Sequence, residues 1–376
     1  MPSAGRRKGR GLARPNFSER QVLGMIVTGA GGKMARYREP GRWRRHYYRV
    51  REFLKRKADF RFLLYRLRWN HASAFDYVGT FPVNLDIEPT EACNLQCVMC
   101  PTGFAGPDDP RMIDMDLVKR LIDQAAANGT YSVKFTFRGE PAIHRGLVEM
   151  VRYAKAKGIP EVQFTTNGIP YTDRKVRDLI EADLDRIIFS IDGSEKETVE
   201  RVRRGIDYDR LVQNVLAFYR LRQELGRAKP FIRVQMVRMK ANYVQVERFV
   251  EMWKPYADDI RISDVTDRGQ GDHMAVGDQR PIGRRRCPQP WQRMVVSSNG
   301  EVVPCCLDWD KRWVVGDATA QPLKEIWRGA RMEAMRQVQR DLRLDEVSPC
   351  RGCTEIASYE WERVPLAAAA KGLTTS

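Results

Sequence analysis

Short apolar runs alternate with amphipathic segments along the middle of the chain. The runs are rich in Val, Ile and Phe, which is typical of buried strands. The pattern predicts strands at 83–89, 133–139, 162–168, 186–193, 231–237 and 259–265. It predicts helices at 114–128, 145–157, 172–182, 208–225 and 242–255. Strands that alternate with helices in this way predict an α/β fold with a parallel sheet and right-handed crossovers.

The N-terminal part lacks this alternation. Residues 1–40 are basic and contain many Gly and Pro residues, so we predict disorder there. Between 42 and 69 apolar residues recur at helical spacing among arginines, which predicts one or two amphipathic helices. The apolar positions are Trp43, Tyr47, Val50, Leu54, Phe60, Leu63, Leu64 and Leu67. We interpret this segment as helices packed on the main domain; the alternative is a surface for a membrane or another anionic partner.

After residue 265 the pattern changes again. Residues 266–286 are Gly-rich and charged, which is typical of a linker or a substrate loop. The segment 293–306 predicts a hairpin around Asn299-Gly300, and 322–340 predicts a helix. The chain therefore divides into an extension, an α/β domain, the linker, a small C-terminal domain and a tail. Their bounds are 1–80, 81–265, 266–286, 287–360 and 361–376.

The net charge of +17 is unevenly distributed. Residues 1–80 contain twenty Lys or Arg and five Asp or Glu, so +15 lies in the extension and only +2 in the rest. The main domain therefore carries no charge signal for nucleic acid. No apolar run approaches the roughly 20 residues that span a bilayer.

Eight cysteines stand in tight groups that lie far apart in the sequence. They are Cys93, Cys97, Cys100, Cys287, Cys305, Cys306, Cys350 and Cys353. Disulfide frameworks are typical of small secreted chains, so we interpret these residues as reduced, metal-binding thiolates. This interpretation predicts a cytoplasmic location.

The first group, Cys93, Cys97 and Cys100, directly follows the first predicted strand with the spacing C-x3-C-x2-C. A structural zinc site normally has four protein ligands. Three thiolates on a four-iron cluster leave one iron open for another ligand. The spacing therefore favours a catalytic iron–sulfur cluster.

This loop, with Asn94 behind its first cysteine and Pro101 behind its last, resembles that of the radical S-adenosylmethionine (SAM) superfamily. Similar motifs stand at later strand ends: 138–141 (Arg-Gly-Glu-Pro), 165–168 (Thr-Thr-Asn-Gly), 190–193 (Ser-Ile-Asp-Gly) and 203–205 (Arg-Arg-Gly). Arg138 replaces the first Gly of the family's pattern. The resemblance covers roughly 83–265 and implies a partial (β/α)6 TIM-like barrel.

The resemblance also implies cofactors and their residues. A [4Fe–4S] cluster would bind the first three cysteines, and SAM would contact Met99, Gly139, Glu140, Asn167, Ser190 and Arg203. Glu140 would accept hydrogen bonds from the methionine amino group, and Gly139 would let the backbone approach the cofactor. One electron from a flavodoxin- or ferredoxin-type reductant would then yield a 5′-deoxyadenosyl radical. Asp192, at a strand end, is a candidate substrate contact.

The second group comprises Cys287, Cys305, Cys350 and Cys353. Four cysteines at this spacing are compatible with zinc. Together with Trp291, Asn-Gly at 299–300 and Gly-Asp at 316–317, they resemble the SPASM module, and more closely its shortened twitch form. The resemblance implies one auxiliary [4Fe–4S] cluster. The seven-cysteine arrangement of peptide-modifying SPASM enzymes is absent from this sequence.

These features predict oxidation of an alcohol to a ketone in a sugar, nucleotide sugar or aminocyclitol, with the auxiliary cluster accepting an electron. The alternative in the same class is an epimerase that uses Cys306 as hydrogen donor. If Cys305 lies on a strand, Cys306 faces the opposite side of the pleat. The simpler interpretation is that Cys306 is a small buried apolar residue.

A zinc-stabilised nucleic-acid-binding protein is the alternative from a different functional class. It leaves the strand-end motifs unexplained, so we expect no specific nucleic-acid partner.

Overall fold

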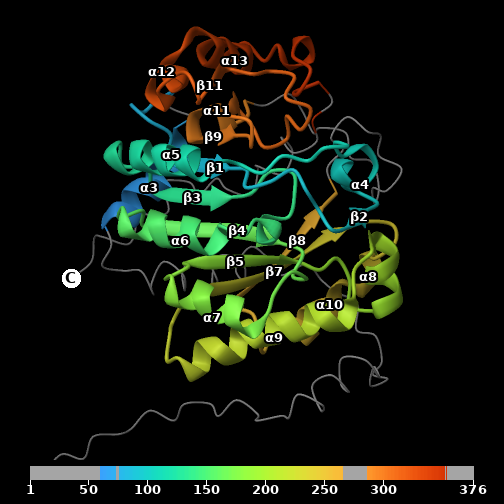
Figure 1. The fold of residues 1–376 in the computed structure, drawn as a ribbon. Helices are drawn as coiled ribbons and strands as arrows, with labels where there is room; N and C mark the ends of the chain where they lie inside the picture. Colours follow the sequence, from blue (N-terminus) through green and yellow to red (C-terminus); the bar gives the residue numbers. More distant parts are fainter. Residues whose placement is uncertain (1–59, 73–75, 266–285, 352, 354–376) are drawn as a thin grey trace, which may run out of the picture.

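Six parallel strands form the centre of the molecule, as the alternating pattern predicts (Figure 1). They are β1 (Asn84–Ile87), β3 (Ser132–Phe135), β4 (Glu161–Thr166), β5 (Arg186–Ser190), β7 (Phe231–Arg238) and β8 (Asp259–Asp264). The computed structural model describes residues 60–72, 76–265, 286–351 and 353. The predictions for residues 1–59, for the linker and for the tail at 361–376 fall outside these residues, except that Arg286 of the linker is described.

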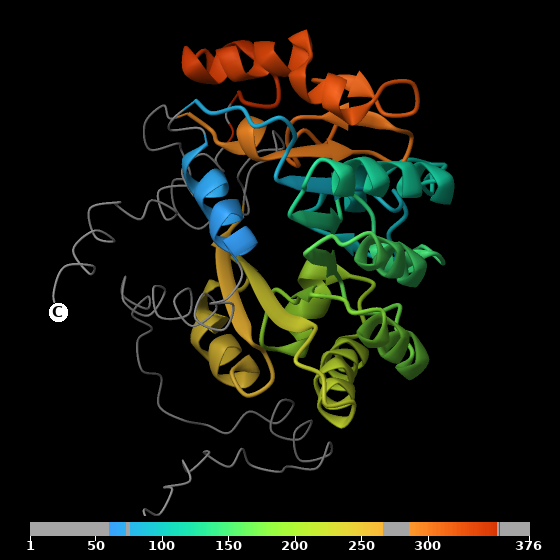
Figure 2. The same cartoon turned by 90° about the vertical axis from the view of Figure 1, so that its left-hand side faces the viewer.

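Amphipathic helices cover the outer face of this sheet (Figures 1 and 2). They are α5 (Met115–Ala127), α6 (Leu147–Ala156), α7 (Asp173–Glu181), α9 (Tyr208–Glu224) and α10 (Val246–Trp253). Asp114, Thr172 and Asp207 begin three of them, because each side chain accepts a hydrogen bond from a backbone N–H in the first turn. The predicted α/β architecture is confirmed.

The two faces of the sheet differ in polarity. Leu85 and Val133 belong to the core beneath the outer helices, whereas the alternate positions Asp86 and Lys134 face the inside of the curve. Figure 2 looks along the strands and shows this curve, with its open side occupied in part by α3 (Phe60–His71). The result is a partial barrel with a polar inner face.

Helix α3 lies near the end of the sheet where the strands begin. Its Tyr65 stacks on Tyr131 with ring centroids 4.4 Å apart, and Trp69 and Val83 join the same apolar cluster. Helix α3 thus packs on the main domain as predicted, but through the side of the helix opposite the leucine stripe. The stripe itself is solvent-exposed, with exposed fractions of 75%, 37%, 47% and 51% for Phe60, Leu63, Leu64 and Leu67.

The predicted hairpin forms from β9 (Arg293–Val296) and β10 (Glu301–Val303). Strand β9 pairs in parallel with β1, and β11 (Gly316–Asp317) pairs with β10, so the C-terminal region extends the barrel sheet to nine strands. The predicted helix at 322–340 is two helices, α12 (Leu323–Arg328) and α13 (Ala330–Arg340), because Gly329 between them is extended. No helix in the described part of the chain is long and apolar enough to cross a membrane.

Several short elements complete the described structure. They are β2 (Gln96–Cys97), β6 (Arg203–Arg204), α4 (Pro101–Ala105), α8 (Lys196–Val202), α11 (Gln289–Gln292) and the 3-10 turns Pro141–Ile143, Tyr243–Gln245 and Leu344–Glu346. The sequence pattern predicts none of them, because periodicity needs longer segments.

A buried ion pair joins the barrel to the C-terminal region. The Glu88 carboxylate, fully buried after β1, accepts hydrogen bonds from Arg138 Nε and Nη2 at 2.8 Å and from the Ser298 backbone N–H at 2.9 Å. Arg138 also donates to Glu91 at 2.5 Å, and its guanidinium lies over the Trp309 ring at 5.6 Å. We call Glu88, Glu91, Arg138, Ser298 and Trp309 the joint.

Replacing Arg138 with Met should destabilise the protein by about 3–5 kcal/mol, because it leaves the Glu88 carboxylate buried without its cation. Urea unfolding of the anaerobically purified protein, followed by circular dichroism, measures this loss. Arg152→Met is the matched control: Arg152 pairs with Glu149 at 3.1 Å on the surface, and its loss should cost less than about 1 kcal/mol. Equal midpoints for the two variants would contradict the importance of the joint.

Candidate functional site

The first cysteine loop lies at the carboxyl end of β1. Cys97 is in β2, which pairs antiparallel with β6 so that Cys97 lies opposite Arg203. The Val98 N–H donates to the Val202 carbonyl at 2.9 Å, and the Cys100 N–H donates to the Cys97 carbonyl at 3.1 Å. The loop is therefore held at both ends before any metal binds.

Burial controls the protonation of these thiols. Desolvation raises the pKa of Cys93 and raises that of Cys97 to about 11, although the nearby Arg203 charge acts in the opposite direction on both. Metal-free Cys93 and Cys97 are therefore protonated at neutral pH, and metal binding must displace their protons.

Gly139 fits against the cysteine loop. A Cβ atom there would lie 2.3 Å from the Thr90 carbonyl oxygen and 2.4 Å from that of Ala92. The Gly139 and Glu140 N–H groups donate to these two carbonyls at 3.2 and 2.8 Å. The requirement for glycine thus comes from close packing of two loops, in addition to any approach to the cofactor.

Glu140 organises the next strand end. Its buried carboxylate accepts hydrogen bonds from the Ala142 N–H, from Thr166 Oγ1 at 2.7 Å and from the Asn167 N–H at 2.6 Å. Burial raises its pKa, and these backbone donors oppose the rise. Its contact with the methionine amino group stays a prediction; its contacts here hold the turn that contains Asn167.

Asn167 and Ser190 lie at neighbouring strand ends. Asn167 Nδ2 donates to Asn94 Oδ1 at 2.8 Å and lies 4.0 Å from Cys93 Sγ. Ser190 Oγ accepts a hydrogen bond from Gln235 Nε2 at 2.8 Å. Met99, half-buried inside the cysteine loop, packs against the main core. The structure brings Asn167 to the first cysteine group, whereas the predicted cofactor contacts of Ser190 and Met99 stay predictions.

Arg203 is buried between an acid and a thiol. Its Nη2 donates to Asp192 at 2.5 Å, and its Nη1 lies 3.8 Å from Cys97 Sγ. Asp192 is fully buried and also accepts a hydrogen bond from the Val237 N–H. Asp192 thus positions Arg203, and its predicted contact with substrate stays a prediction. Among the described residues Arg203 Nε has no hydrogen-bond partner, so this buried donor can bind an anion such as a carboxylate.

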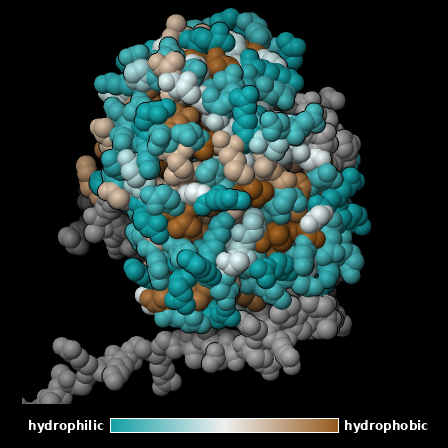
Figure 3. Space-filling model, in the orientation of Figure 1, coloured by the Kyte–Doolittle hydropathy of each residue, from teal (hydrophilic) through white to brown (hydrophobic). Residues whose placement is uncertain are grey.

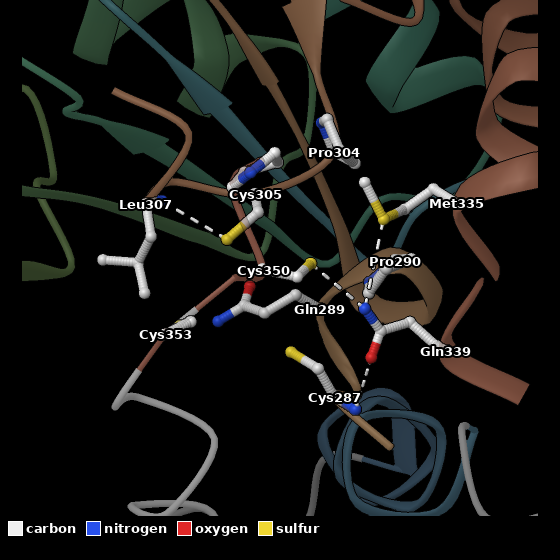
Figure 4. Close-up of a pocket in the computed structure, with 11 residues that line it drawn as sticks. Cys287, Gln289, Pro290, Pro304, Cys305, Leu307, Met335, Gln339, Cys350 and Cys353 are labelled. Carbon is white, nitrogen blue, oxygen red and sulfur yellow. Dashed lines mark hydrogen bonds between the residues drawn. The ribbon is translucent and has the colours of Figure 1, made fainter. Parts of the chain in front are cut away.

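The second cysteine group lines a single pocket (Figure 4). The four cysteines come from the start of α11, the turn after β10 and the C-terminal segment, and the pocket wall includes the apolar Pro290, Pro304, Leu307 and Met335. The Gln339 side chain of α13 bridges two of the cysteines. Its Oε1 accepts a hydrogen bond from the Cys287 N–H at 2.9 Å, and its Nε2 donates one to Cys350 Sγ at 3.3 Å. Burial raises the pKa of Cys350 to about 12.

Cys305 and Cys306 do not alternate across a strand. Strand β10 ends at Val303, and both cysteines follow in the turn. A hydrogen bond with the Cys306 side chain, together with burial, raises the pKa of Cys305. Cys306 therefore lies beside a predicted cluster ligand and not on the opposite side of a pleat.

Comparison with known proteins identifies the domains. Residues 87–225 match the model of the radical SAM superfamily, and residues 287–354 match the SPASM iron–sulfur cluster-binding domain. The chain therefore contains a radical SAM domain followed by a SPASM domain. Both matched regions coincide with the two cysteine sites.

Curated relatives in this superfamily differ in activity. The chain is 32% identical over 202 residues to a GTP 3′,8-cyclase of Chlorobaculum tepidum, covering 53% of this chain and 58% of the relative. It is 30% identical to a cofactor-modifying protein for tungsten-containing aldehyde ferredoxin oxidoreductase of Pyrococcus furiosus, covering 43% and 45%. It is 29% identical to the mycofactocin maturase MftC of Mycolicibacterium smegmatis, covering 50% and 46%. The matches thus span about half the length of these relatives.

Solved structures confirm the fold. SuiB of Streptococcus suis bound to the precursor peptide SuiA aligns with a TM-score of 0.59 at 17% identity, covering 76% of this chain and 72% of SuiB. BtrN in complex with AdoMet and 2-DOIA aligns with a TM-score of 0.50 at 18% identity, covering 73% and 92%. The radical SAM barrel followed by an auxiliary-cluster region is therefore the architecture of this chain.

The radical SAM domain implies a [4Fe–4S] cluster with SAM at the first site, and the SPASM domain implies auxiliary iron–sulfur binding at the second. The residues fit these groups: three thiols with an unpaired guanidinium nitrogen at the first site, and four thiols in an apolar-walled pocket at the second. When bound, the first cluster and SAM supply a carbon-centred radical. The sequence analysis did not name Glu88, Glu91 or Lys134 as functional residues. For Lys134 a signal existed: it alternates with the apolar Val133 and Phe135 of β3, which places it on the inner face of the sheet.

Gly139→Ala should reduce the iron bound at the first site by at least about half, because a Cβ would displace the carbonyls of the cysteine loop. Iron and sulfide analysis with the electron paramagnetic resonance spectrum of the reduced protein, with and without SAM, measures this loss. The control is Gly129→Ala: its φ of +72° strains an alanine, but no atom lies within 4 Å of the added Cβ, so the iron should be retained. A SAM-responsive signal of full intensity in the Gly139 variant would refute the packing argument.

Proposed function

We propose that the chain is a radical SAM oxidoreductase that converts an alcohol of a polar small molecule into a ketone. The observation that carries this proposal is the second pocket, which Cys287, Cys305, Cys350 and Cys353 all line. Four thiolates would ligate every iron of a [4Fe–4S] cluster, so substrate has no open iron to bind there. A cluster of this kind is suited to accepting one electron from a substrate radical.

The substrate class follows from the inner face of the barrel. Charged and amide side chains on β1, β3, β4 and β7 point inward, which favours a ligand with many hydroxyl or amino groups. We propose a sugar, nucleotide sugar or aminocyclitol. The 2-DOIA bound in the BtrN structure and the peptides bound in SuiB structures are both suitable members of a test panel. A flavodoxin- or ferredoxin-type protein in the cytoplasm would supply the starting electron.

The test uses anaerobically reconstituted protein, SAM, dithionite and a panel containing 2-DOIA, nucleotide sugars, inositols and the SuiA peptide. We expect 5′-deoxyadenosine formation with one polyol and a product lighter by two hydrogens. Cys350→Ala should keep substrate-dependent 5′-deoxyadenosine but lower the ketone yield at least about tenfold, because the electron acceptor is lost. About eight irons per chain is the expected content of two four-iron clusters.

Three results would overturn this assignment. Zinc without sulfide would remove the cluster chemistry and favour the zinc-binding alternative. Deuterium incorporation from heavy water without mass loss, abolished in Cys306→Ala, would identify an epimerase with Cys306 as hydrogen donor. Turnover of the peptide alone would replace the small-molecule substrate.

We also propose that the exposed face of α3 rests on an anionic membrane. Figure 3 shows one side of the molecule as mainly hydrophilic with small, separate hydrophobic areas. The α3 stripe differs, because four large apolar side chains at positions i, i+3, i+4 and i+7 are exposed together. Arg61, Arg66 and Arg68 stand among them, and the first 80 residues carry a net charge of +15. Apolar insertion combined with positive charge is typical of interfacial helices.

Sedimentation with phosphatidylglycerol–phosphatidylcholine vesicles tests this surface. We expect binding that weakens with salt and falls at least about tenfold in Leu64→Gln/Leu67→Gln, because two exposed apolar contacts are lost. Val244→Gln, at an equally exposed apolar residue outside α3, should bind like the wild type. Unchanged binding of the double variant, or equal binding to purely zwitterionic vesicles, would contradict the proposal.

A further inference from the structure

Lys134 is a lysine on the inner face of the barrel that pairs with none of the described residues. It lies on β3, in register with Asp86 of β1 and Gln163 of β4. It is half-buried, and it makes no hydrogen bond or ion pair with any described residue. The arginines of the same face are paired: Arg293 with Asp86 at 2.9 Å, and Arg233 with Asp259 at 2.5 Å.

The surroundings make this amine easier to deprotonate than an ordinary lysine. Burial, together with Arg293 and Arg233, lowers the pKa of Lys134 to about 8, whereas Asp86 and Cys306 act in the opposite direction. These four groups come from β9, β7, β1 and the turn after β10, respectively. An amine with this pKa is roughly one-tenth neutral at pH 7, compared with roughly one in three thousand for an ordinary lysine. Lys134 can therefore accept a proton under ordinary conditions.

Lys134 also has a specific relation to both cysteine sites. Its strand leads directly into the turn of Arg138, Gly139 and Glu140, which packs on the first cysteine loop. On the other side, Cys306, the neighbour of the auxiliary ligand Cys305, is close enough for its charge to act on the amine. Lys134 therefore lies on the strand that leads to the first cysteine site and within electrostatic reach of the turn that contains Cys305.

We propose that Lys134 is the proton acceptor of the oxidation, taking the hydroxyl proton of the substrate radical. This inference rests on the proposed function. Hydrogen abstraction breaks one carbon–hydrogen bond and leaves a radical on the carbinol carbon. The neutral amine then takes the hydroxyl proton and becomes an ammonium, and the remaining electron passes to the auxiliary cluster as the carbon–oxygen double bond forms. The substrate loses two hydrogens in total, one to 5′-deoxyadenosine and one proton to Lys134.

The amine can be tested without any substrate. Competitive trace acetylation of the intact reconstituted protein across pH 6–11, followed by peptide mass spectrometry, reports the reactivity of each lysine. We expect the reactivity of Lys134 to rise to half its plateau near pH 8, with the exposed Lys324 as internal reference. A midpoint for Lys134 above about pH 10 would overturn the proposal, because too little neutral amine would then exist.

Turnover then tests the role. In the wild type, ketone formation should rise about tenfold per pH unit below pH 8 and level off above it. Lys134→Met should retain substrate-dependent 5′-deoxyadenosine and its deuterium label but lose ketone at least about tenfold, without a pH-dependent rise. Lys134→His should restore part of the yield and move the rise to about pH 6.5, whereas Lys324→Met should behave like the wild type.

The outcomes separate the two proposals. A wild type that transfers substrate deuterium to 5′-deoxyadenosine but makes no ketone overturns the oxidation itself. A wild type that makes ketone, with Lys134→Met showing the same yield and the same pH profile, overturns only the role of Lys134. Circular dichroism and iron content are measured on every variant, so a folding defect in Lys134→Met would be recognised. In that case the ketone yield and pH profile of Lys134→His decide whether residue 134 accepts the proton.

Discussion

The burial of the Glu88 carboxylate is the constraint on which the arrangement of the two cysteine sites depends. A carboxylate without exposed surface is stable only with a paired cation and further donors, and Arg138 and the Ser298 N–H provide them. Cys93 follows Glu88 in the chain, and Cys305 follows Ser298. One charge therefore ties the loop of the first cluster, the Arg-Gly-Glu turn and the hairpin of the auxiliary region into a single assembly.

The same constraint explains the departure from the family pattern at residue 138. A glycine there could not reach Glu88, Glu91 and the Trp309 ring, whereas the planar arginine contacts all three. The next position cannot carry any side chain, because the Thr90 and Ala92 carbonyls fill the space beside Gly139. In this turn Arg138 pairs with two carboxylates, and the position of Gly139 accepts no side chain. Both residues hold the cysteine loop in place.

Periodicity predicted the parallel strands and outer helices because each buries a regular apolar face over many residues. It did not decide which face of α3 packs, since Tyr65 and Trp69 on one side and the leucines on the other are all apolar. Strands β2 and β6 are too short for any pattern, and their pairing is purely tertiary. At the site, the family resemblance named Asn167 as a cofactor contact, and the structure places it beside Cys93 and Asn94. The pairing of Asp192 with Arg203 was inaccessible, because it depends on how a turn and a distant helix end meet in space.

The inner face of the barrel is the strongest physical argument for a ligand there. A parallel sheet covered on both faces normally carries apolar residues on both, and ion pairs such as Asp86–Arg293 are often no more stabilising than well-packed hydrophobic replacements. Stability alone would not keep Arg293, Arg233 and Lys134 on one wall. Two of these cations have their own carboxylates, so their charges are largely satisfied within the protein. The third, Lys134, has a pKa that burial and the surrounding cations lower towards neutral pH, which is useful for proton transfer and of little use for folding.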